Sequence, residues 1–333
     1  MINTQNHIHL VIATPSWSKM NDNTSIQHAI GTATQHPEDA DPLLEACTSG
    51  NTDTLRELLL QPAMAQAALS WEVRVTFDDP KSDVHIEESI LNLHFMLQKA
   101  AGTGHAAIMR QLFEFARDNS VDIKTIIEHE TVEATIKSNS TDALQVLIDV
   151  DPSVVSYHMG HGGDPLTRAV CGDKENLVAL LLERGADPNR DCWVSHLGKP
   201  GFYLYNAAWF ASFRVVELLL QHGAKVPQSG ALHKAAEKGR LDVMRLLVTN
   251  GADVNEQLEI WGVSRRGLEM LETPLHVAVL NSQREAAAWL VEHGADVSIQ
   301  DKEGSTAVDI AHSVGTSDMV ETLSAGARNT CAV

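Results

Sequence analysis

A motif that recurs along the chain restricts the possible folds more than any other feature of the sequence. Segments 164–189, 230–255 and 273–297 each contain a short helical pattern, a polar turn, a second helical pattern and then Gly-Ala-Asp. In the second of these segments, Val243 and Leu247 fall on one face of the second helix. A single helix pair of this size cannot bury its apolar face alone, so successive pairs are expected to stack on one another.

The residues at the helix ends agree with this pattern. Asp164 and Thr273 each precede a proline, which favours a helix start because the first residue caps free N–H groups and proline is tolerated in the first turn. Gly251 and Gly294 follow the second helical pattern, and glycine ends helices because it adopts the left-handed region without strain. The sequence therefore predicts a regular array of helix-turn-helix units.

The segments TPLH at 273–276 and GADVN at 251–255, with a spacing near 33 residues between turns, resemble the ankyrin repeat family. The resemblance covers about residues 42–327 and implies an all-α solenoid of about eight helix-turn-helix units with hairpin fingers. It also implies that His233 and His276, in the TPLH slot, tie neighbouring units together. With Gly50 as a weaker first match, we place the turns between paired helices at Gly104, Ser140, Asp173, Ala211, Gly239, Ser282 and Gly315.

The regions outside the repeats divide the chain further. Residues 1–41 are rich in Thr, Ser, Asn, Gln and His and are expected to form a disordered or loosely packed arm. Residues 63–88 form an insertion, in which the apolar alternation from Val73 to Phe77 predicts a strand or an extended arm. Residues 328–333 remain as a C-terminal tail.

The composition restricts the kinds of partner and the cellular compartment that we expect. The 333 residues include 25 basic and 44 acidic side chains, a formal net charge of −19, which disfavours nucleic acid and anionic membranes as partners. The four cysteines form no CxxC motif and no dense framework, so a reducing environment is expected. Because no signal peptide and no apolar run of membrane-spanning length is evident, we expect a cytoplasmic or nuclear protein.

Aromatic residues make up 5% of the chain, yet seven of the sixteen lie between Trp193 and Phe213. This stretch overlaps one of three enlarged fingers, at 153–163, 188–203 and 256–271, which the resemblance places along one rim of a groove. We predict that the binding residues of the groove and its fingers are Trp193, His196, Tyr203, Tyr205, Asn206, Trp209, Phe210, Trp261, Arg265 and Arg266.

The first helix of the fifth unit is the centre of this prediction. The resemblance implies that Asn206, Trp209 and Phe210 face the groove, and apolar rings left open to water are costly. A finger, a partner or a small molecule is therefore expected to cover them. In the alternative interpretation the cluster is a local mini-core, and Phe213 is expected to point into the core in either case. The matching positions of the sixth unit are interpreted as ordinary polar residues: Lys234, Glu237 and Lys238.

No catalytic or cofactor-binding motif accompanies the repeats. The sequence contains no Gly-x-Ser-x-Gly, no P-loop and no dinucleotide-binding glycine motif. Several donors on the fingers could meet, but their spacing matches no compact zinc site. These donors are His158, His161, Asp164, Asp191, Cys192 and His196. We therefore predict no catalytic residue, no metal site and no cofactor.

Two functions of different classes follow. The first is an adaptor or scaffold that binds a protein or peptide partner in the concave groove. The second is binding of an aromatic or polyketide-like small molecule, or non-canonical catalysis, in a secondary-metabolite pathway. A similarity in overall style to the small, solitary ankyrin proteins of filamentous fungi suggests this second function. In a third and purely structural case, the enlarged fingers only cover the groove.

Overall fold

The computed structural model describes residues 41–77, 85–159, 163–190, 202–260, 270–314 and 317–330. The chain divides into two compact units, residues 1–37 with Trp71–Ile90 and residues 38–70 with 91–333. Within the described residues, the first unit consists of strand β1 (Trp71–Phe77) and all but the last residue of its paired strand β2 (His85–Leu91). The predicted arm at 1–41 lies outside the described residues, except that Asp41 begins the first helix.

The described part of the second unit contains eight helix pairs in chain order, as the sequence predicts. The first helices of the pairs are α1 (Asp41–Ser49), α4 (Asn92–Thr103), α6 (His129–Ser138), α8 (Pro165–Cys171), α10 (Phe202–Phe210), α12 (Ala231–Glu237), α14 (Pro274–Leu280) and α16 (Ala307–Val314). The second helices are α2 (Thr52–Leu59), α5 (Ala106–Asp118), α7 (Thr141–Val150), α9 (Glu175–Glu183), α11 (Phe213–Gln221), α13 (Leu241–Thr249), α15 (Arg284–Glu292) and α17 (Ser317–Thr330). Helix α17 continues into the segment predicted as a tail.

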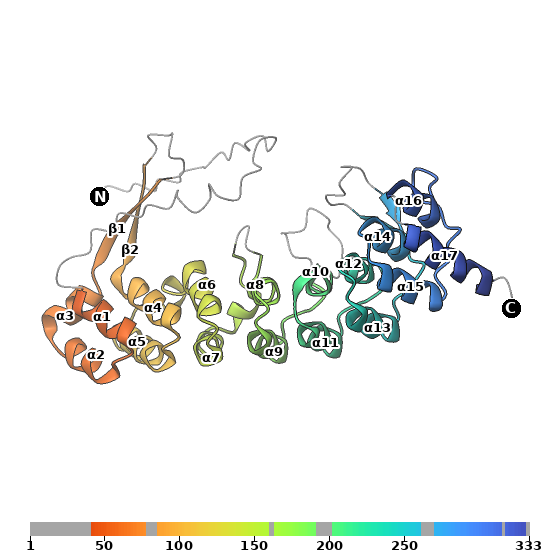
Figure 1. The fold of residues 1–333 in the computed structure, drawn as a ribbon. Coiled ribbons are helices and arrows are strands. Elements are labelled where there is room, and N and C mark those ends of the chain that lie inside the picture. The colour runs from red at the N-terminus through yellow and green to blue at the C-terminus, as the bar shows by residue number, and fades with distance from the viewer. Residues whose placement is uncertain are drawn as a thin grey trace, which may run out of the picture. The chain divides into compact units, whose positions relative to one another are not determined.

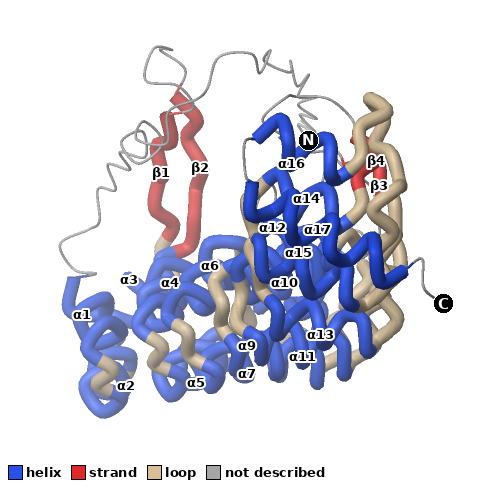
Figure 2. Tube along the Cα trace, turned by 45° about the vertical axis from the view of Figure 1, so that its right-hand side comes forward, coloured by secondary structure: helices blue, strands red, loops and turns tan. Residues whose placement is uncertain are grey.

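The helix pairs stack in one register from the first pair to the last. Each first helix packs against the first helix of the next pair, from α1 on α4 to α14 on α16, and the second helices pack in the same order from α2 to α17. Figures 1 and 2 show the pairs side by side in chain order. The predicted all-α ankyrin solenoid is therefore the observed architecture of this unit.

Small residues on the first helices allow this close stacking. Ala207 and Ala208 of α10 and Ala235 and Ala236 of α12 are completely buried, and these two helices pack against each other. An alanine at such a contact lets two helix backbones approach without a cavity or a clash. The core consequently continues through the whole stack as one apolar layer between first and second helices.

Most turns between paired helices adopt the left-handed conformation that is typical of the repeat, but the predicted turn residue of the fifth pair, Ala211, does not. The backbone φ is 76° at Gly104, 68° at Gly239 and 50° at Asp173. In the third pair the left-handed residue is Asn139, with φ of 56°, so the predicted turn position Ser140 was wrong by one residue. Ser140 instead caps α7, where its side chain accepts a hydrogen bond from the Ala143 N–H. Asparagine tolerates the left-handed region, and serine is a preferred N-cap.

Two buried histidines form hydrogen bonds between neighbouring pairs. The Nε2 atom of His233 lies 3.0 Å from the Glu272 carbonyl, and the Nε2 atom of His276 lies 3.2 Å from the Ser305 carbonyl. Both histidines are buried. Their predicted structural role as ties between repeats is confirmed.

Two departures from the helical pattern add short strands. The insertion predicted at 63–88 begins inside helix α3 (Pro62–Ala68) and continues into β1, which confirms extended structure from Val73 to Phe77. In the finger predicted at 256–271, β3 (Leu258–Ile260) pairs antiparallel with β4 (Met270–Glu272). Two short 3₁₀ helices, η3 (Ile123–Thr125) and η4 (Pro152–Ser156), precede α6 and α8. No described helix combines the length and the apolar character that crossing a bilayer would require.

Candidate partner-binding surface

Helix α10 has an unusual composition that leaves part of its apolar surface uncovered. Its sequence is FYLYNAAWF, in which Asn206 is the only residue that is neither apolar nor aromatic. A helix that is apolar on all sides is normally buried on all sides. In a stack of helix pairs, however, a first helix contacts its two neighbours and its partner and leaves one face open. Trp209 and Phe210 lie on that face and are 37% and 45% exposed.

The two rings lie next to each other and next to lysines of the following pair. The ring centroids of Trp209 and Phe210 are 5.7 Å apart with an interplanar angle of 50°. The Nζ atom of Lys234 lies 4.7 Å from the Trp209 ring centroid, and the Nζ atom of Lys238 lies 5.6 Å from it. Lys234 also lies over the ring of Tyr205, at 5.2 Å. All of these distances are within the range of cation–π attraction.

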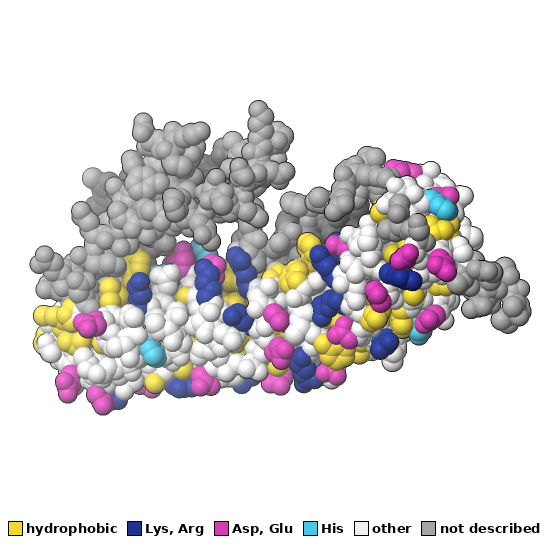
Figure 3. Space-filling view, in the orientation of Figure 1, with side chains coloured by type: hydrophobic (Ala, Val, Ile, Leu, Met, Phe, Trp, Pro, Cys, Tyr) yellow, Lys and Arg dark blue, Asp and Glu magenta, His cyan; other side chains and the backbone are white. Residues whose placement is uncertain are grey.

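We call Tyr205, Trp209, Phe210, Lys234 and Lys238 the aromatic–lysine surface. Figure 3 shows hydrophobic side chains beside basic side chains over α10 and α12, the helices that carry these residues. Burial lowers the pKa of Lys234, but its hydrogen bond to Glu237 and the neighbouring Tyr205 outweigh this effect, so the pKa is raised. Lys234 is therefore cationic at neutral pH, as a cation–π contact requires.

Sequence reasoning missed the lysines of this surface. Lys234 and Lys238 were interpreted as ordinary polar residues, because each helix was considered within its own repeat. In the aligned repeats they occupy the positions that Asn206 and Phe210 occupy one repeat earlier. Since the first helices stack in register, a comparison of adjacent repeats could have placed the lysines beside the aromatic rings.

Two of the predicted binding residues are buried instead of open to the groove. Tyr203 is 1% exposed, and its hydroxyl donates a hydrogen bond to Asp164 Oδ2 at 2.5 Å. Asp164 is itself buried and caps α8 by accepting from the Thr167 N–H. Tyr203 thus joins the fourth and fifth pairs and offers no surface to a partner. Asn206 is also buried.

The prediction for Phe213 was wrong in the opposite direction. This residue was expected in the core, yet it is 39% exposed. Phe213 is the first residue of α11, and the buried face of that helix consists of Val215, Val216, Leu218 and Leu219. The side chain therefore lies outside the apolar stripe that packs against α10.

Half of the predicted binding residues lie outside the residues that the structure describes. Trp193 and His196 fall within 191–201, and Trp261, Arg265 and Arg266 fall within 261–269, both outside the described residues. The same holds for His161, Asp191 and Cys192 of the donors considered for zinc. These predictions remain predictions.

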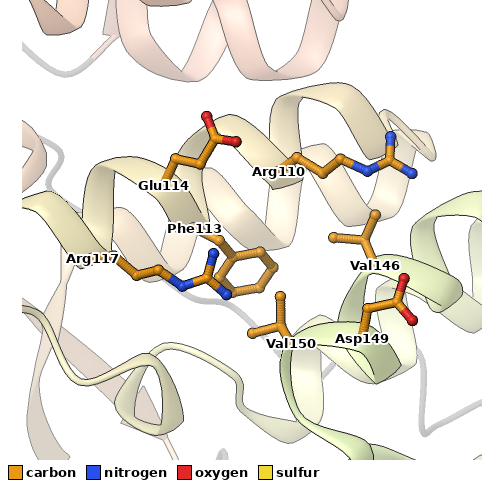
Figure 4. Close-up of a pocket in the computed structure, with 7 residues that line it drawn as sticks. All are labelled: Arg110, Phe113, Glu114, Arg117, Val146, Asp149 and Val150. Carbon is orange, nitrogen blue, oxygen red and sulfur yellow. The ribbon is translucent and has the colours of Figure 1, made fainter.

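Apart from the aromatic–lysine surface, the structure has a hollow among the second helices. It has a volume of about 250 Å³ and lies between α5 and α7. Figure 4 shows Arg110 and Arg117 of α5 on either side of the Phe113 ring, next to Val146, Asp149 and Val150 of α7, while the Glu114 carboxylate points away from α7. Asp149 is already paired with Arg184 at 3.2 Å. Because acidic and basic groups alternate around it, this hollow does not favour a ligand of one charge.

The stacked helix pairs and the exposed aromatic residues of α10 define a helical repeat protein with a candidate binding surface on its first helices. Family models for ankyrin repeats match residues 232–291, as many copies, and residues 262–332, as three copies. The chain is therefore an ankyrin repeat protein. Ankyrin repeats generally mediate protein–protein interaction.

Similar proteins come from distant organisms. Over 84% of this chain, 26% of residues are identical to ankyrin repeat protein nuc-2 of Neurospora crassa. Over 46% of the chain, 33% are identical to the B-cell lymphoma 3 protein homolog of Mus musculus. Alpha-latrocrustotoxin-Lt1a of Latrodectus tredecimguttatus is 28% identical over 48% of the chain. The matches span only 27%, 37% and 12% of these proteins, respectively, so they support the repeat and not one shared activity.

Proposed function

We propose that this protein is an adaptor that holds a protein or peptide partner on the aromatic–lysine surface. The observation that carries the proposal is the exposed pair Trp209 and Phe210 beneath two lysines of the next repeat. Trp and Phe are enriched at the centres of interfaces and dominate their energetics. The general role of ankyrin repeats in protein–protein interaction supports the same class of function.

The exposed ring area is large enough to matter for binding. Trp and Phe side chains each bury roughly 150–250 Å² when fully covered. With 37% and 45% exposed, the two rings together offer about 170 Å² to a partner. At roughly 25 cal/mol per Å², covering this area contributes about 4 kcal/mol before the costs of association are subtracted. This is enough for the two rings to act as the central anchor of an interface.

The charges around the rings indicate the chemistry of the partner. The molecule as a whole carries a net charge of −19, but Lys234 and Lys238 make this patch locally basic. Lys238 is nearly half exposed and lies 3.8 Å from Glu237, so it can exchange that weak pair for a carboxylate of the partner. A segment with an aromatic or aliphatic residue next to an acidic residue fits both features.

Selection from a random peptide library on the immobilised full chain tests this proposal. Labelled versions of the selected peptides are titrated by fluorescence polarisation against wild type, Trp209→Ala and Phe210→Ala. Leu60→Ala is the matched control, because Leu60 is also a large exposed apolar side chain but lies at the end of α2. We expect each aromatic variant to weaken binding at least about tenfold, or 1.4 kcal/mol, and the control to bind as wild type does. Equal affinity for wild type and both folded aromatic variants would refute the adaptor role of this surface.

The small-molecule alternative uses the same side chains and is tested in parallel. Saturable quenching of tryptophan fluorescence by an aromatic compound, lost in Trp209→Ala, would favour it if no peptide is selected. The purely structural case predicts a third result. Trp209→Ala then lowers the free energy of unfolding by several kcal/mol, as core truncations do, and binding of any ligand does not depend on it.

A further inference from the structure

Two first helices of the stack are longer than the repeat requires. Helices α4 and α6 have 12 and 10 residues, whereas the other first helices have 7 to 9. The additional residues lie at the N-terminal ends, before the part of each helix that matches the common repeat. They bring together His94 of α4 and Glu128 and Glu130 at the start of α6. The repeat itself gives no reason for these three residues to meet.

One ring nitrogen of His94 contacts a backbone carbonyl, as is common in histidines that bind a metal through the other nitrogen. Its side chain is completely buried, and Nδ1 lies 3.3 Å from the Ile126 carbonyl. A carbonyl oxygen only accepts, so this contact places a proton on Nδ1, and Nε2 of the neutral ring then carries a lone pair. Histidine ligands commonly donate their other ring N–H to a backbone carbonyl in this way. Among the described residues, Nε2 has no hydrogen-bond partner.

The surroundings of Nε2 do not explain its burial. Glu128 Oε2 is 3.7 Å from Nε2, which is too long for a hydrogen bond. In the tautomer set by Ile126, a ring lone pair and a carboxylate oxygen then face each other with no proton between them. Glu128 is the N-cap residue of α6, yet its side chain makes no capping hydrogen bond. A cation between the two atoms would satisfy both.

The spacing of the donor atoms suits a small tetrahedral ion. One ligand atom from each of the three residues lies within 4.8 Å of the other two. Zinc bonds of roughly 2.0–2.1 Å in tetrahedral geometry place ligand atoms about 3.4 Å apart, close to the 3.7 Å observed between His94 and Glu128. The glutamates are partly exposed, so their side chains can close the remaining distance and water can supply a fourth ligand. Glu130 is also oriented by His129, whose Nδ1 lies 3.1 Å from Glu130 Oε2.

We propose that His94, Glu128 and Glu130 bind one divalent transition-metal cation, with Zn²⁺ as the favoured ion. The imidazole suits transition-metal ions such as Zn²⁺, which also accepts carboxylate ligands, whereas Mg²⁺ and Ca²⁺ prefer oxygen ligands alone. The bound ion links the second helix pair to the third. It stabilises their junction because folding assembles the site from residues that lie more than thirty positions apart in the sequence.

Metal titration of the full chain, freed of metal with a chelator, tests the site. Zn²⁺ binding is measured by calorimetry and by the rise in the melting temperature, and Co²⁺ is used as a spectroscopic probe. We expect one saturable equivalent and the visible absorption of tetrahedral Co²⁺. Glu128→Gln and Glu130→Gln should each weaken this binding at least tenfold and remove the thermal shift.

The control for the metal titration is Glu183→Gln, which removes an exposed carboxylate at the end of α9 and should bind as wild type does. Circular dichroism verifies that all variants are folded. The proposal is overturned if wild type shows no saturable equivalent of Zn²⁺. It is equally overturned if either of the Glu128 and Glu130 variants binds as tightly as wild type.

Discussion

The hydrogen bond between Tyr203 and Asp164 offers a sharp test of how the fourth and fifth repeats hold together. Tyr203→Phe removes one hydroxyl and leaves the buried ring in place. The lost bond is short, at 2.5 Å, and ends on a buried carboxylate. Hydrogen bonds to charged groups contribute roughly 1.5–3 kcal/mol, so we expect the free energy of unfolding to fall by about 2 kcal/mol. Asp164 keeps its two bonds from Thr167, which limits the loss.

Urea unfolding followed by circular dichroism measures this change. Tyr205→Phe is the matched control, because Tyr205 lies on the same helix but is only half-buried, and its effect should stay below about 1 kcal/mol. A double-mutant cycle with Asp164→Asn isolates the pair, and we expect a coupling energy of about 1–2 kcal/mol. A coupling energy near zero, or equal effects of the two tyrosine variants, would refute the reasoning and return Tyr203 to the set of candidate contact residues.

Two further predictions concern the turns and the ties of the repeat. Gly104→Ala should lower the free energy of unfolding by more than about 1 kcal/mol, since φ is 76° and the added Cβ would lie 2.9 Å from the Ser140 Cβ. The control is Gly185→Ala, because a Cβ added at this exposed glycine meets no atom beyond its chain neighbours within 4 Å. Thermal denaturation of both variants shows whether the contact with Ser140 destabilises the protein. Burial lowers the pKa of His233 from 6.5 to about 4, so below pH 6.5 the unfolded chain binds more protons than the folded chain. The stability associated with His233 is therefore present above pH 6.5 and is lost as the pH falls toward 4, by up to about 3 kcal/mol. His233→Gln should flatten that part of the pH–stability profile, and an unchanged profile would contradict the assignment.

Local residue preferences made most of the fold predictable. Helix starts at Asp164 and Thr273, the close-packed alanines and the histidine ties depend on contacts within a repeat or between adjacent repeats. Such contacts recur with the period of the sequence, so the pattern alone indicates them. The error at Ser140 has the same origin, because the side chains of both Asn139 and Ser140 suit a turn. Only the backbone geometry decides which of the two adopts the left-handed conformation.

The candidate site was harder to predict, because it depends on which side of a helix remains open. Helix α10 is apolar on all sides, so its sequence does not distinguish the buried Tyr203 from the exposed Phe210. Phe213 was misplaced for a related reason, since the first residue of a helix need not share the face of its apolar stripe. The cluster at His94 could not be found at all from the period. It arises where α4 and α6 exceed the repeat, and a search for periodic features passes over such additional turns.

The two proposed sites can succeed or fail independently, and the architecture explains why. In a stacked array each helix pair contacts only its neighbours. His94 and Glu128 belong to the second and third pairs, whereas Trp209 and Lys234 belong to the fifth and sixth, and the fourth pair lies between them. Substitutions without shared contacts usually have additive effects on stability. Glu128→Gln should therefore leave peptide affinity at the aromatic–lysine surface unchanged, and Trp209→Ala should leave Zn²⁺ affinity unchanged. A measured coupling above about 0.5 kcal/mol would mean that the stack transmits strain across an entire repeat, which the local packing seen here does not predict.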